Sequence, residues 1–225
     1  GAAGDETIWR RLGQRVARGH HFQRITSGDT GGGGWLYAPV PDLGAGAFRN
    51  GKQFCLIVNG KRIQVTAERD PAALPHAANG IDIVMECTGF FTNKAGGQKH
   101  LDAGAKRVLI SAPAKEVDLT VVYGVNHDVI TPEMTIISNA SCTTNCLAPV
   151  VKVIHEQFGI KHGCITTIHN VTGTQTLVDM PNTKKSDLRR ARSGMVNLAP
   201  TSTGSATAIV EIYPELKGKL NGLAV

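Results

Sequence analysis

The side chain best suited to chemistry in this sequence is a cysteine that lies among small hydroxyl and amide residues. The stretch SNASCTTNC, residues 138–146, places Cys142 directly before an apolar run with helical spacing. A thiol in the first turn of a helix faces unpaired backbone N–H groups and the positive end of the helix dipole, and both stabilise a thiolate. Cys142 is therefore a candidate nucleophile. Cys146 lies one turn deeper and is interpreted as a packing or supporting residue.

A cysteine nucleophile needs a base, and the segments that follow indicate one. The run TTNCLAPVVKVIHEQF predicts an amphipathic helix that stops at Gly159. Its apolar face is formed by Leu147, Val150, Val151, Ile154 and Phe158. About sixteen helical residues advance roughly 24 Å, and about eight strand residues in GCITTIHN return roughly 26 Å. His169 therefore returns to the level of Cys142, and the two form a candidate catalytic pair.

Two other interpretations of these residues stay open at this point. A buried structural thiol and an ordinary histidine at a strand end would show the same spacing. A metal site is not favoured, because C-x3-C with distant histidines lacks the paired ligand spacings that are typical of zinc.

Short hydroxyl side chains next to glycine or positive charge indicate anion binding. Ser141, Thr143 and the later run PTSTGSATAIV place hydroxyl groups where helices begin, and oxyanions bind well at such positions. The run KKSDLRRARS lies between these two helix starts. A solvated loop would also explain its charges, but beside two such helix starts we interpret it as a phosphate-recognition segment.

The preceding residues predict the elements that position these groups. FCLIVNGKRIQVTAE predicts a hairpin around Asn59-Gly60. IDIVMECTG, NKAGGQKHLDAGA and RVLISAP predict a strand, a helix and a strand, which together make a parallel βαβ unit. Ligands of such sheets bind at the carboxyl ends of the strands, here at Thr88-Gly89 and from Ser111 to Pro113. Residues 1–51 are rich in glycine and proline, and beyond one or two helical turns that WRRLGQRVA could form we assign no regular elements there.

Composition narrows the class of protein. The chain has 225 residues, a formal charge of +6 and only 5% aromatic residues, and it lacks the basic stripe with interleaved aromatics that is typical of nucleic-acid binding. Apolar runs are too short to span a membrane, and acidic residues near the N-terminus do not fit a secretory signal. Five scattered cysteines are typical of reduced thiols. We expect a cytoplasmic protein.

Several longer motifs together resemble the phosphorylating glyceraldehyde-3-phosphate dehydrogenase family. They are SNASCTTNCLAPVVKV, TTIHNVTGTQ, DLRRAR, PTSTGSATAI and PELKGKLNGLAV, with VNGKRI, ECTGFFT, AGAKRVLISAP and YGVNHD before them. The resemblance runs from about residue 52 to the last residue. It implies an α/β fold in which a partial Rossmann-like, parallel-sheet NAD-binding domain in residues 52–141 precedes the first part of an α+β catalytic domain in residues 142–225. Residues 1–51 stay unassigned and are expected to be poorly ordered.

The resemblance also implies a chemistry for the site. Cys142 would form a hemithioacetal with glyceraldehyde 3-phosphate, His169 would act as the base, and NAD would accept a hydride. Inorganic phosphate would then cleave the resulting thioester to give 1,3-bisphosphoglycerate.

The binding residues follow from the same resemblance. The positions that match those holding the attacking phosphate are Ser141, Thr143, Arg190, Thr203 and Gly204. Thr172 matches a position that holds the substrate phosphate. The positions that match the cofactor cleft are Thr88, Gly89, Phe91 and Ser111.

Three features depart from the family pattern. Residues 1–51 lack the glycine fingerprint for the NAD pyrophosphate, and we hypothesise a frame-shifted or wrongly joined reading frame there. The family continues beyond Val225 with further binding residues and most of the catalytic sheet, so we expect this chain to be inactive as it stands and to expose an apolar face of its sheet. DMPNTKKSDLRR is two residues longer than usual, in a loop near the subunit interface of the family homotetramer.

Alternative functions remain open at this stage. IHNVTGTQTLVD, RRARS and GSATAI look most like the branch of the family that uses arsenate to make 1-arseno-3-phosphoglycerate. A non-catalytic remnant that binds phosphate or a partner subunit is a second alternative. A thiol hydrolase or acyltransferase that uses the same pair without NAD is a third.

Overall fold

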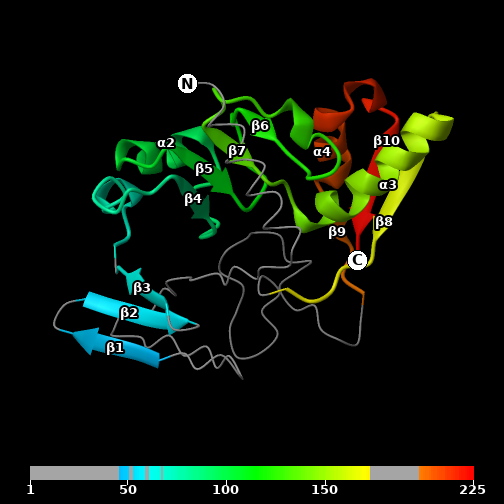
Figure 1. Cartoon of the computed structure of the whole chain (residues 1–225). Coiled ribbons are helices and arrows are strands. Elements are labelled where there is room, and N and C mark those ends of the chain that lie inside the picture. Colours follow the sequence, from blue (N-terminus) through cyan, green and yellow to red (C-terminus); the bar gives the residue numbers. More distant parts are fainter. Residues whose placement is uncertain (1–45, 51–52, 59–60, 67, 173–197) are drawn as a thin grey trace.

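The computed structural model describes residues 46–50, 53–58, 61–66, 68–172 and 198–225. Three sheets and three α-helices carry this part of the chain (Figure 1). Among the described helices, none combines the length and the apolar character that crossing a bilayer requires. The glycine- and proline-rich residues before Gly46 and the run KKSDLRRARS, which contains Arg190, lie outside the described residues.

A parallel four-stranded sheet forms the first layer. Its strands are β4 (Ile83–Glu86), β5 (Arg107–Ile110), β7 (Ile136–Ser138) and β6 (Leu119–Thr120), and they lie in the order β4-β5-β7-β6. Every neighbouring pair is parallel. Helix α2 (Lys94–Asp102) connects β4 with β5. The predicted βαβ unit and the α/β, Rossmann-like fold class are therefore confirmed.

Apolar strands explain why this sheet forms. All residues of β5 are buried, as a parallel sheet covered on both faces requires. Val108, Ile110 and Ile136 pack on one face, and Leu109 and Ile137 belong to a cluster of their own. Helix α2 comes close to β7 because Gly97 has no side chain, since a Cβ atom there would lie 2.7 Å from Cγ2 of Ile136.

The second layer is built around a mixed sheet and two helices. Its strands are β8 (Gly163–Thr167), β10 (Leu220–Ala224) and β9 (Thr201–Ser202), and β10 pairs parallel with β8 and antiparallel with β9. Helices α3 (Cys142–Phe158) and α4 (Ser205–Ile212) contact each other, and α4 also contacts β6 and β10 (Figure 1). Their shared core includes Ala148, Val151, Ile209 and Leu216.

Short 3-10 helices complete the described elements. They are η1 (Pro71–Ala73), η2 (His127–Val129) and η4 (Pro214–Leu216). The predicted helix over residues 143–158 is confirmed, with Ser141 as its N-cap and Gly159, at φ 73°, as its C-cap.

The expectation of no element in residues 1–51 is wrong for the last of them. Strand β1 (Gly46–Asn50) pairs antiparallel with β2 (Gln53–Val58), which pairs with β3 (Lys61–Val65). The local sequence of β1 has weak strand propensity, but pairing with β2 supplies the main-chain hydrogen bonds. Val58 lies opposite Lys61, so the strands of the predicted hairpin are confirmed, while Asn59-Gly60 itself lies outside the described residues.

The predicted apolar face of α3 is only partly buried. Val151 is in the core and Leu147 packs against it. Val150, Ile154 and Phe158 are instead 53%, 45% and 85% exposed. The reason is that α4 packs on the side of α3 that carries Ala148 and Val151, so the neighbouring face of the helix stays open. The amphipathic spacing therefore predicted the helix correctly, but it predicted more buried residues on this face than the structure has.

Candidate active site

The carboxyl ends of three parallel strands deliver the candidate residues to one edge of the first sheet. Strand β4 leads into Thr88-Gly89, β5 into Ser111, and β7 into Ser141 and Cys142. The ends of parallel strands meet at the same edge, which is where ligands bind in open α/β sheets. The thiol and the positions matched to the cofactor cleft therefore come from neighbouring strand ends.

The turn before α3 is held in a conformation that side chains rarely adopt. Ala140 has φ 56°, in the left-handed region that non-glycine residues avoid. Its N–H donates to Ser138 Oγ at 3.0 Å, and the Ser138 hydroxyl donates to the Ala112 carbonyl at 2.7 Å. Strained backbone of this kind persists where the surroundings hold it, often at functional sites. Here it turns the chain from β7 into the helix that begins with Cys142.

The N-cap of α3 then fixes the first turn. Ser141 Oγ accepts a hydrogen bond from Thr144 N at 3.0 Å and lies 2.7 Å from Thr144 Oγ1. Asn145 donates from Nδ2 to the carbonyl oxygens of Asn139 and Ser141, at 2.8 and 2.9 Å. Sequence reasoning missed Asn145, although its amide within a run of small polar residues was a usable signal. Together these bonds immobilise the backbone that carries Cys142.

The structure brings Cys142 and His169 together. Cys142 Sγ lies 3.3 Å from His169 Nε2. His169 Nδ1 is 2.7 Å from the carbonyl oxygen of Asn170, and a carbonyl only accepts, so Nδ1 carries a proton. Nε2 is therefore the nitrogen that shares a proton with the thiol. The backbone N–H of His169 donates to the Val225 carbonyl at 2.8 Å and so extends the pairing of β8 with β10 beyond the strand end.

The surroundings favour the thiolate of Cys142. The hydrogen bond with His169 is the largest cause that lowers the pKa of this thiol below its ordinary value. Burial acts in the opposite direction and is outweighed. Hydrogen bonds from the backbone and side chain of Thr143 lower the pKa further, as expected at the start of a helix.

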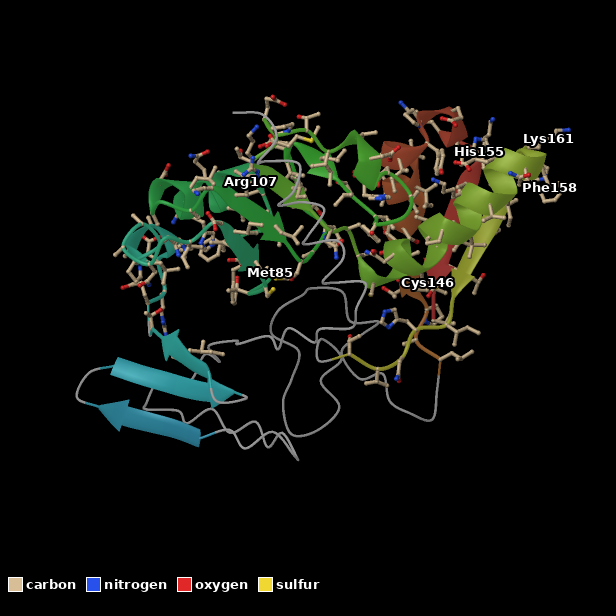
Figure 2. All side chains as sticks on the ribbon, viewed as in Figure 1. Met85, Arg107, Cys146, His155, Phe158 and Lys161 are labelled. Atoms are coloured by element: carbon tan, nitrogen blue, oxygen red, sulfur yellow. The ribbon has the colours of Figure 1, made fainter. Side chains whose placement is uncertain are left out.

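An open depression of about 230 Å³ lies directly over the pair. It is lined by Cys142, Thr143, Cys146, Thr167, Ile168, His169 and Asn170. Cys146 is exposed at this end of α3, so its interpretation as a packing residue is wrong, while its supporting role stays a prediction (Figure 2). The side of α3 that carries both thiols is not covered by the core, which is why the second cysteine faces solvent.

The matched phosphate positions are divided between this depression and the start of α4. Thr143 lines the depression, and Ser141 caps α3 beside it. Thr203 and Gly204 immediately precede α4, where Thr203 Oγ1 accepts from Ser205 N at 3.3 Å, and neither residue lines the depression. Thr172 is half-buried a few residues after His169.

The matched cofactor positions lie together at the ends of β4 and β5. Thr88 N–H donates to Glu86 Oε1 at 2.7 Å, and Ser111 N–H donates to the Glu86 carbonyl at 2.9 Å. Gly89 has φ 77° and nothing near its missing side chain, and Ser111 is exposed. An exposed glycine backbone and an exposed hydroxyl at neighbouring strand ends are groups that a dinucleotide can approach closely and hydrogen-bond, so the residues present fit NAD. Among the described residues, no three potential metal ligands are grouped.

Comparison with known proteins agrees with this arrangement. Residues 45–94 match the family model of the glyceraldehyde 3-phosphate dehydrogenase NAD binding domain, and residues 141–225 match the model of its C-terminal domain. The first match begins earlier than residue 52, where the sequence resemblance was placed, and includes β1. NAD is accordingly the cofactor of the family to which the first domain model belongs.

Curated relatives are similar over most of this chain. Glyceraldehyde-3-phosphate dehydrogenase of Zymomonas mobilis is 57% identical over 171 residues, and glyceraldehyde-3-phosphate dehydrogenase 1 of Bacillus subtilis is 56% identical over the same length. The Mycobacterium leprae enzyme is 54% identical. Each alignment covers 76% of this chain and 50% of the relative, so the chain spans about half the length of the curated relatives it matches. With both domain models matched and this level of identity, the chain belongs to the glyceraldehyde-3-phosphate dehydrogenase family.

Proposed function

We propose that this chain carries the thiol centre of an NAD-dependent, phosphorylating glyceraldehyde-3-phosphate dehydrogenase. The observation that carries the proposal is the 3.3 Å contact between Cys142 Sγ and His169 Nε2 at the start of α3. A thiol paired with an imidazole is a nucleophile with its base, and the lowered pKa of Cys142 supports the ionised form.

In the proposed reaction, Cys142 Sγ attacks the aldehyde carbon of glyceraldehyde 3-phosphate. A sulfur–carbon bond forms, the carbonyl electron pair moves to oxygen, and the His169 imidazolium gives its proton to that oxygen. The product is a hemithioacetal with a neutral imidazole beside it. His169 Nε2 then takes back the hydroxyl proton as a hydride leaves the same carbon. NAD, when bound, supplies the acceptor for this hydride.

The second half of the reaction releases the product. Loss of the hydride leaves a thioester on Cys142. A phosphate oxygen attacks the thioester carbon, the sulfur–carbon bond breaks, and the thiolate returns to its place beside protonated His169. The acyl phosphate that leaves is 1,3-bisphosphoglycerate. The cycle ends with the thiolate–imidazolium pair from which it began.

Anion binding follows from the residues around the pair. We assign the attacking phosphate to Thr143, Arg190 and the Thr203-Gly204 segment, and the substrate phosphate to Thr172. Ser141 is assigned to the same attacking phosphate, and its Oγ also caps α3 by accepting from Thr144 N–H. Assembly into a homotetramer belongs to the same proposal.

The test is an assay of the purified chain with glyceraldehyde 3-phosphate, NAD and phosphate, followed by the absorbance of reduced cofactor. We expect Cys142→Ser to remove any activity and Cys146→Ser to keep it, which makes Cys146 the matched control. Replacement of phosphate by arsenate in the same assay addresses the arsenate-using branch.

Two other results would redirect the proposal. If no reduced cofactor forms while Cys142 is still alkylated much faster than Cys146, the chain is a non-catalytic remnant with an activated thiol. If the chain turns over acyl esters without NAD, it is a thiol hydrolase or acyltransferase. Equal alkylation rates of the two thiols would contradict an activated Cys142 altogether.

A further inference from the structure

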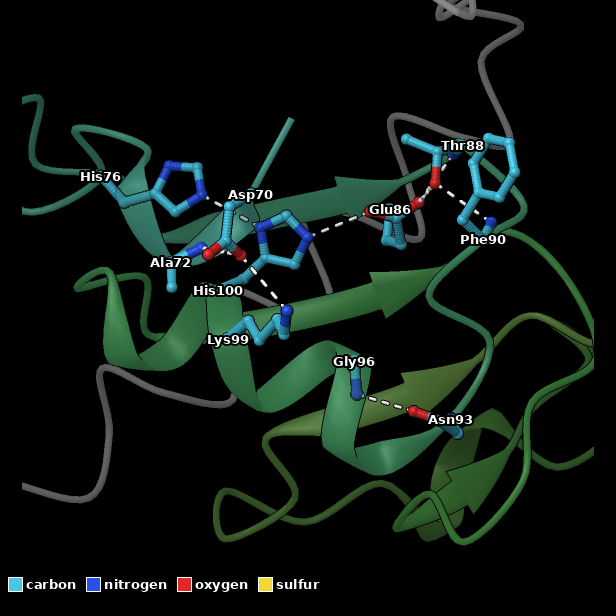
Figure 3. A network of polar contacts seen from close by, with 10 residues as sticks. All are labelled: Asp70, Ala72, His76, Glu86, Thr88, Phe90, Asn93, Gly96, Lys99 and His100. Carbon is cyan, nitrogen blue, oxygen red and sulfur yellow. Dashed lines mark hydrogen bonds and ion pairs between the residues drawn. The ribbon is translucent and has the colours of Figure 1, made fainter. Parts of the chain in front are cut away.

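A buried polar network links α2 with the turn after β4 (Figure 3). His100, on the buried side of α2, is 4% exposed, and so is Glu86 at the end of β4. His100 Nε2 lies 3.0 Å from Glu86 Oε2, and His100 Nδ1 lies 3.1 Å from His76 Nε2. The Cys142–His169 chemistry does not use these groups, and the sequence motifs did not single them out.

The network defines which atoms carry protons. Glu86 is a carboxylate, because hydrogen bonds from His100 and Thr88 outweigh the effect of burial and lower its pKa. A carboxylate only accepts, so His100 must donate from Nε2. With one proton on the His100 ring, Nδ1 is left to accept and His76 donates from Nε2. The Glu86 carboxylate thus determines which nitrogen of His100 carries the proton. The tautomer of His100 then determines that His76 is the donor in their contact.

The other end of the network is the Thr88-Gly89 turn. Glu86 Oε1 accepts from the backbone N–H of Thr88 at 2.7 Å and from the Thr88 hydroxyl. The same hydroxyl oxygen accepts from Phe90 N–H at 3.2 Å. Between them Gly89 has φ 77°, a conformation open to glycine. The carboxylate therefore holds the backbone at the start of this turn, and the Thr88 hydroxyl extends the hold to Phe90.

The same helix supports the other side of this turn. Phe91 packs against α2 where Gly96 has no side chain, since a Cβ atom there would lie 2.7 Å from Phe91 Cβ. The Phe91 ring meets the His100 ring edge-on at 6.4 Å between centroids, and Lys99 Nζ lies 5.6 Å from the Phe91 ring centroid. His100 therefore contacts the matched cofactor positions in two ways. It reaches Thr88 through Glu86, and it contacts Phe91 directly.

We propose that His100 is a positioning residue for the NAD cleft, which acts by holding the Glu86 carboxylate that shapes the Thr88-Gly89 turn. The inference rests on the proposed function, because the role of this turn in binding NAD comes from it. A buried polar network whose members are hydrogen-bonded to one another fixes one arrangement of the groups it joins. The contact between Glu86 and His100 therefore acts mainly through the geometry of the turn.

The primary experiment measures amide hydrogen exchange of Thr88 and Phe90 by NMR in the full chain. His100→Leu removes the donor to Glu86, and we expect both amides to exchange about tenfold faster or more. The reason is that Glu86, which accepts from Thr88 N–H, is no longer held, and Thr88 Oγ1, which accepts from Phe90 N–H, is held by Glu86 in turn. His100→Gln keeps a donor at the Nε2 position and should restore most of the protection. His155→Leu, which removes the contact between His155 on α3 and Glu215 on η4, is the matched control and should leave these amides unchanged.

A second measurement does not depend on a variant that removes the histidine. In Glu86→Gln the amide group can donate to His100, so the ring should change to the tautomer protonated at Nδ1, while Thr88 keeps its acceptor. Nitrogen-15 NMR of the histidine rings reports this change directly. The unaltered chain should show His100 protonated at Nε2, and the opposite tautomer there would overturn the inference.

NAD titration separates this inference from the proposed function. If the unaltered chain binds NAD, His100→Leu should weaken binding about tenfold and His100→Gln much less. Equal affinity and equal amide exchange in all variants would overturn the positioning role. If the unaltered chain does not bind NAD, the proposed cofactor function fails, and the amide exchange still decides whether His100 holds the turn.

Discussion

At the scale of single residues, the reactivity of Cys142 depends on its imidazole neighbour. The pKa of the thiol is lowered first by the hydrogen bond with His169, so thiolate is present at a lower pH than for an ordinary cysteine. In His169→Asn the pKa of the Cys142 thiol should rise. Alkylation of Cys142 by iodoacetamide at neutral pH should then slow about tenfold for each unit by which this pKa rises. Rates across pH, measured for each cysteine by peptide mass spectrometry, test this.

Two other exposed thiols serve as internal references. Cys146 and Cys164 are also exposed, and their rates should change little in the same variant. If the rate profiles of Cys142 with and without His169 coincide, the hydrogen bond does not control the thiol.

The approach of these two residues could be predicted from chain geometry, because helix rise and strand rise are constant and the connecting glycine marks the reversal. The exposure of Cys146 could not, because periodicity defines a face of α3 and does not say what packs on it. The partnership of Glu86 with His100 was also hidden. Glu86 lies on a strand and His100 on a helix, and the two meet only because both are buried where these elements pack. No sequence motif contains both residues.

At the scale of elements, the N-cap of α3 couples helix stability to the site. In Ser141→Ala, Thr144 N–H loses its acceptor and the buried Thr144 hydroxyl loses a neighbour. We expect the free energy of unfolding to fall by about 1 to 2 kcal/mol. Ser141→Asn keeps a capping acceptor and should recover most of this. Urea unfolding measures both, and an alanine variant as stable as the asparagine variant would contradict the capping role.

A second element-scale prediction concerns Asp118, which ties β7 to α2. Burial alone would raise its pKa, but the hydrogen bond from Lys94 Nζ and two backbone N–H groups at the start of β7 outweigh it and lower the pKa to about 2. A depressed carboxyl pKa stabilises the fold above the unfolded value near 3.8, and the contribution disappears as pH falls through about 2. Asp118→Asn should therefore cost about 1 to 2 kcal/mol at neutral pH.

The pH dependence of this cost is the decisive measurement. The difference in unfolding free energy between the unaltered chain and Asp118→Asn should shrink as pH approaches 2. Asp82→Asn is the control, because Asp82 pairs with Lys106 at 2.7 Å with both side chains more than half exposed. Exposed pairs contribute little, so this variant should be nearly neutral. A cost for Asp118→Asn that is the same at every pH would exclude the charge as its origin.

Helices and strands could be predicted where the local sequence pattern and the tertiary packing favour the same structure. The apolar runs of β4 and β5 and the spacing of α3 are such cases. Strand β1 is the opposite case, since its residues have little strand propensity and its pairing with β2 determines the structure. The burial of the α3 side chains also depends on segments that are distant in the sequence. The apolar spacing of α3 alone could therefore not predict which of its side chains are buried.

At the scale of the whole molecule, one continuous segment joins the two layers. Strand β7 ends in the parallel sheet, and three residues separate it from α3, which packs on α4 beside the mixed sheet. The thiol lies at this junction, between the strand ends matched to the cofactor and the strand that brings back His169. The proposed chemistry therefore depends on how the two layers are joined.

The same arrangement leaves an apolar face of α3 uncovered, and we expect it to drive self-association. Val150, Val153, Ile154 and Phe158 lie three or four residues apart and are 53%, 60%, 45% and 85% exposed. Contiguous exposed apolar surface favours contact with other protein surfaces. Light scattering should therefore show an apparent mass that rises with concentration. Replacing Val153 and Phe158 with glutamine, a good helix former, should weaken this association about tenfold or more. Val129→Gln, at an isolated exposed valine of η2, should have no effect, and a concentration-independent mass of the unaltered chain would show that the face does not associate.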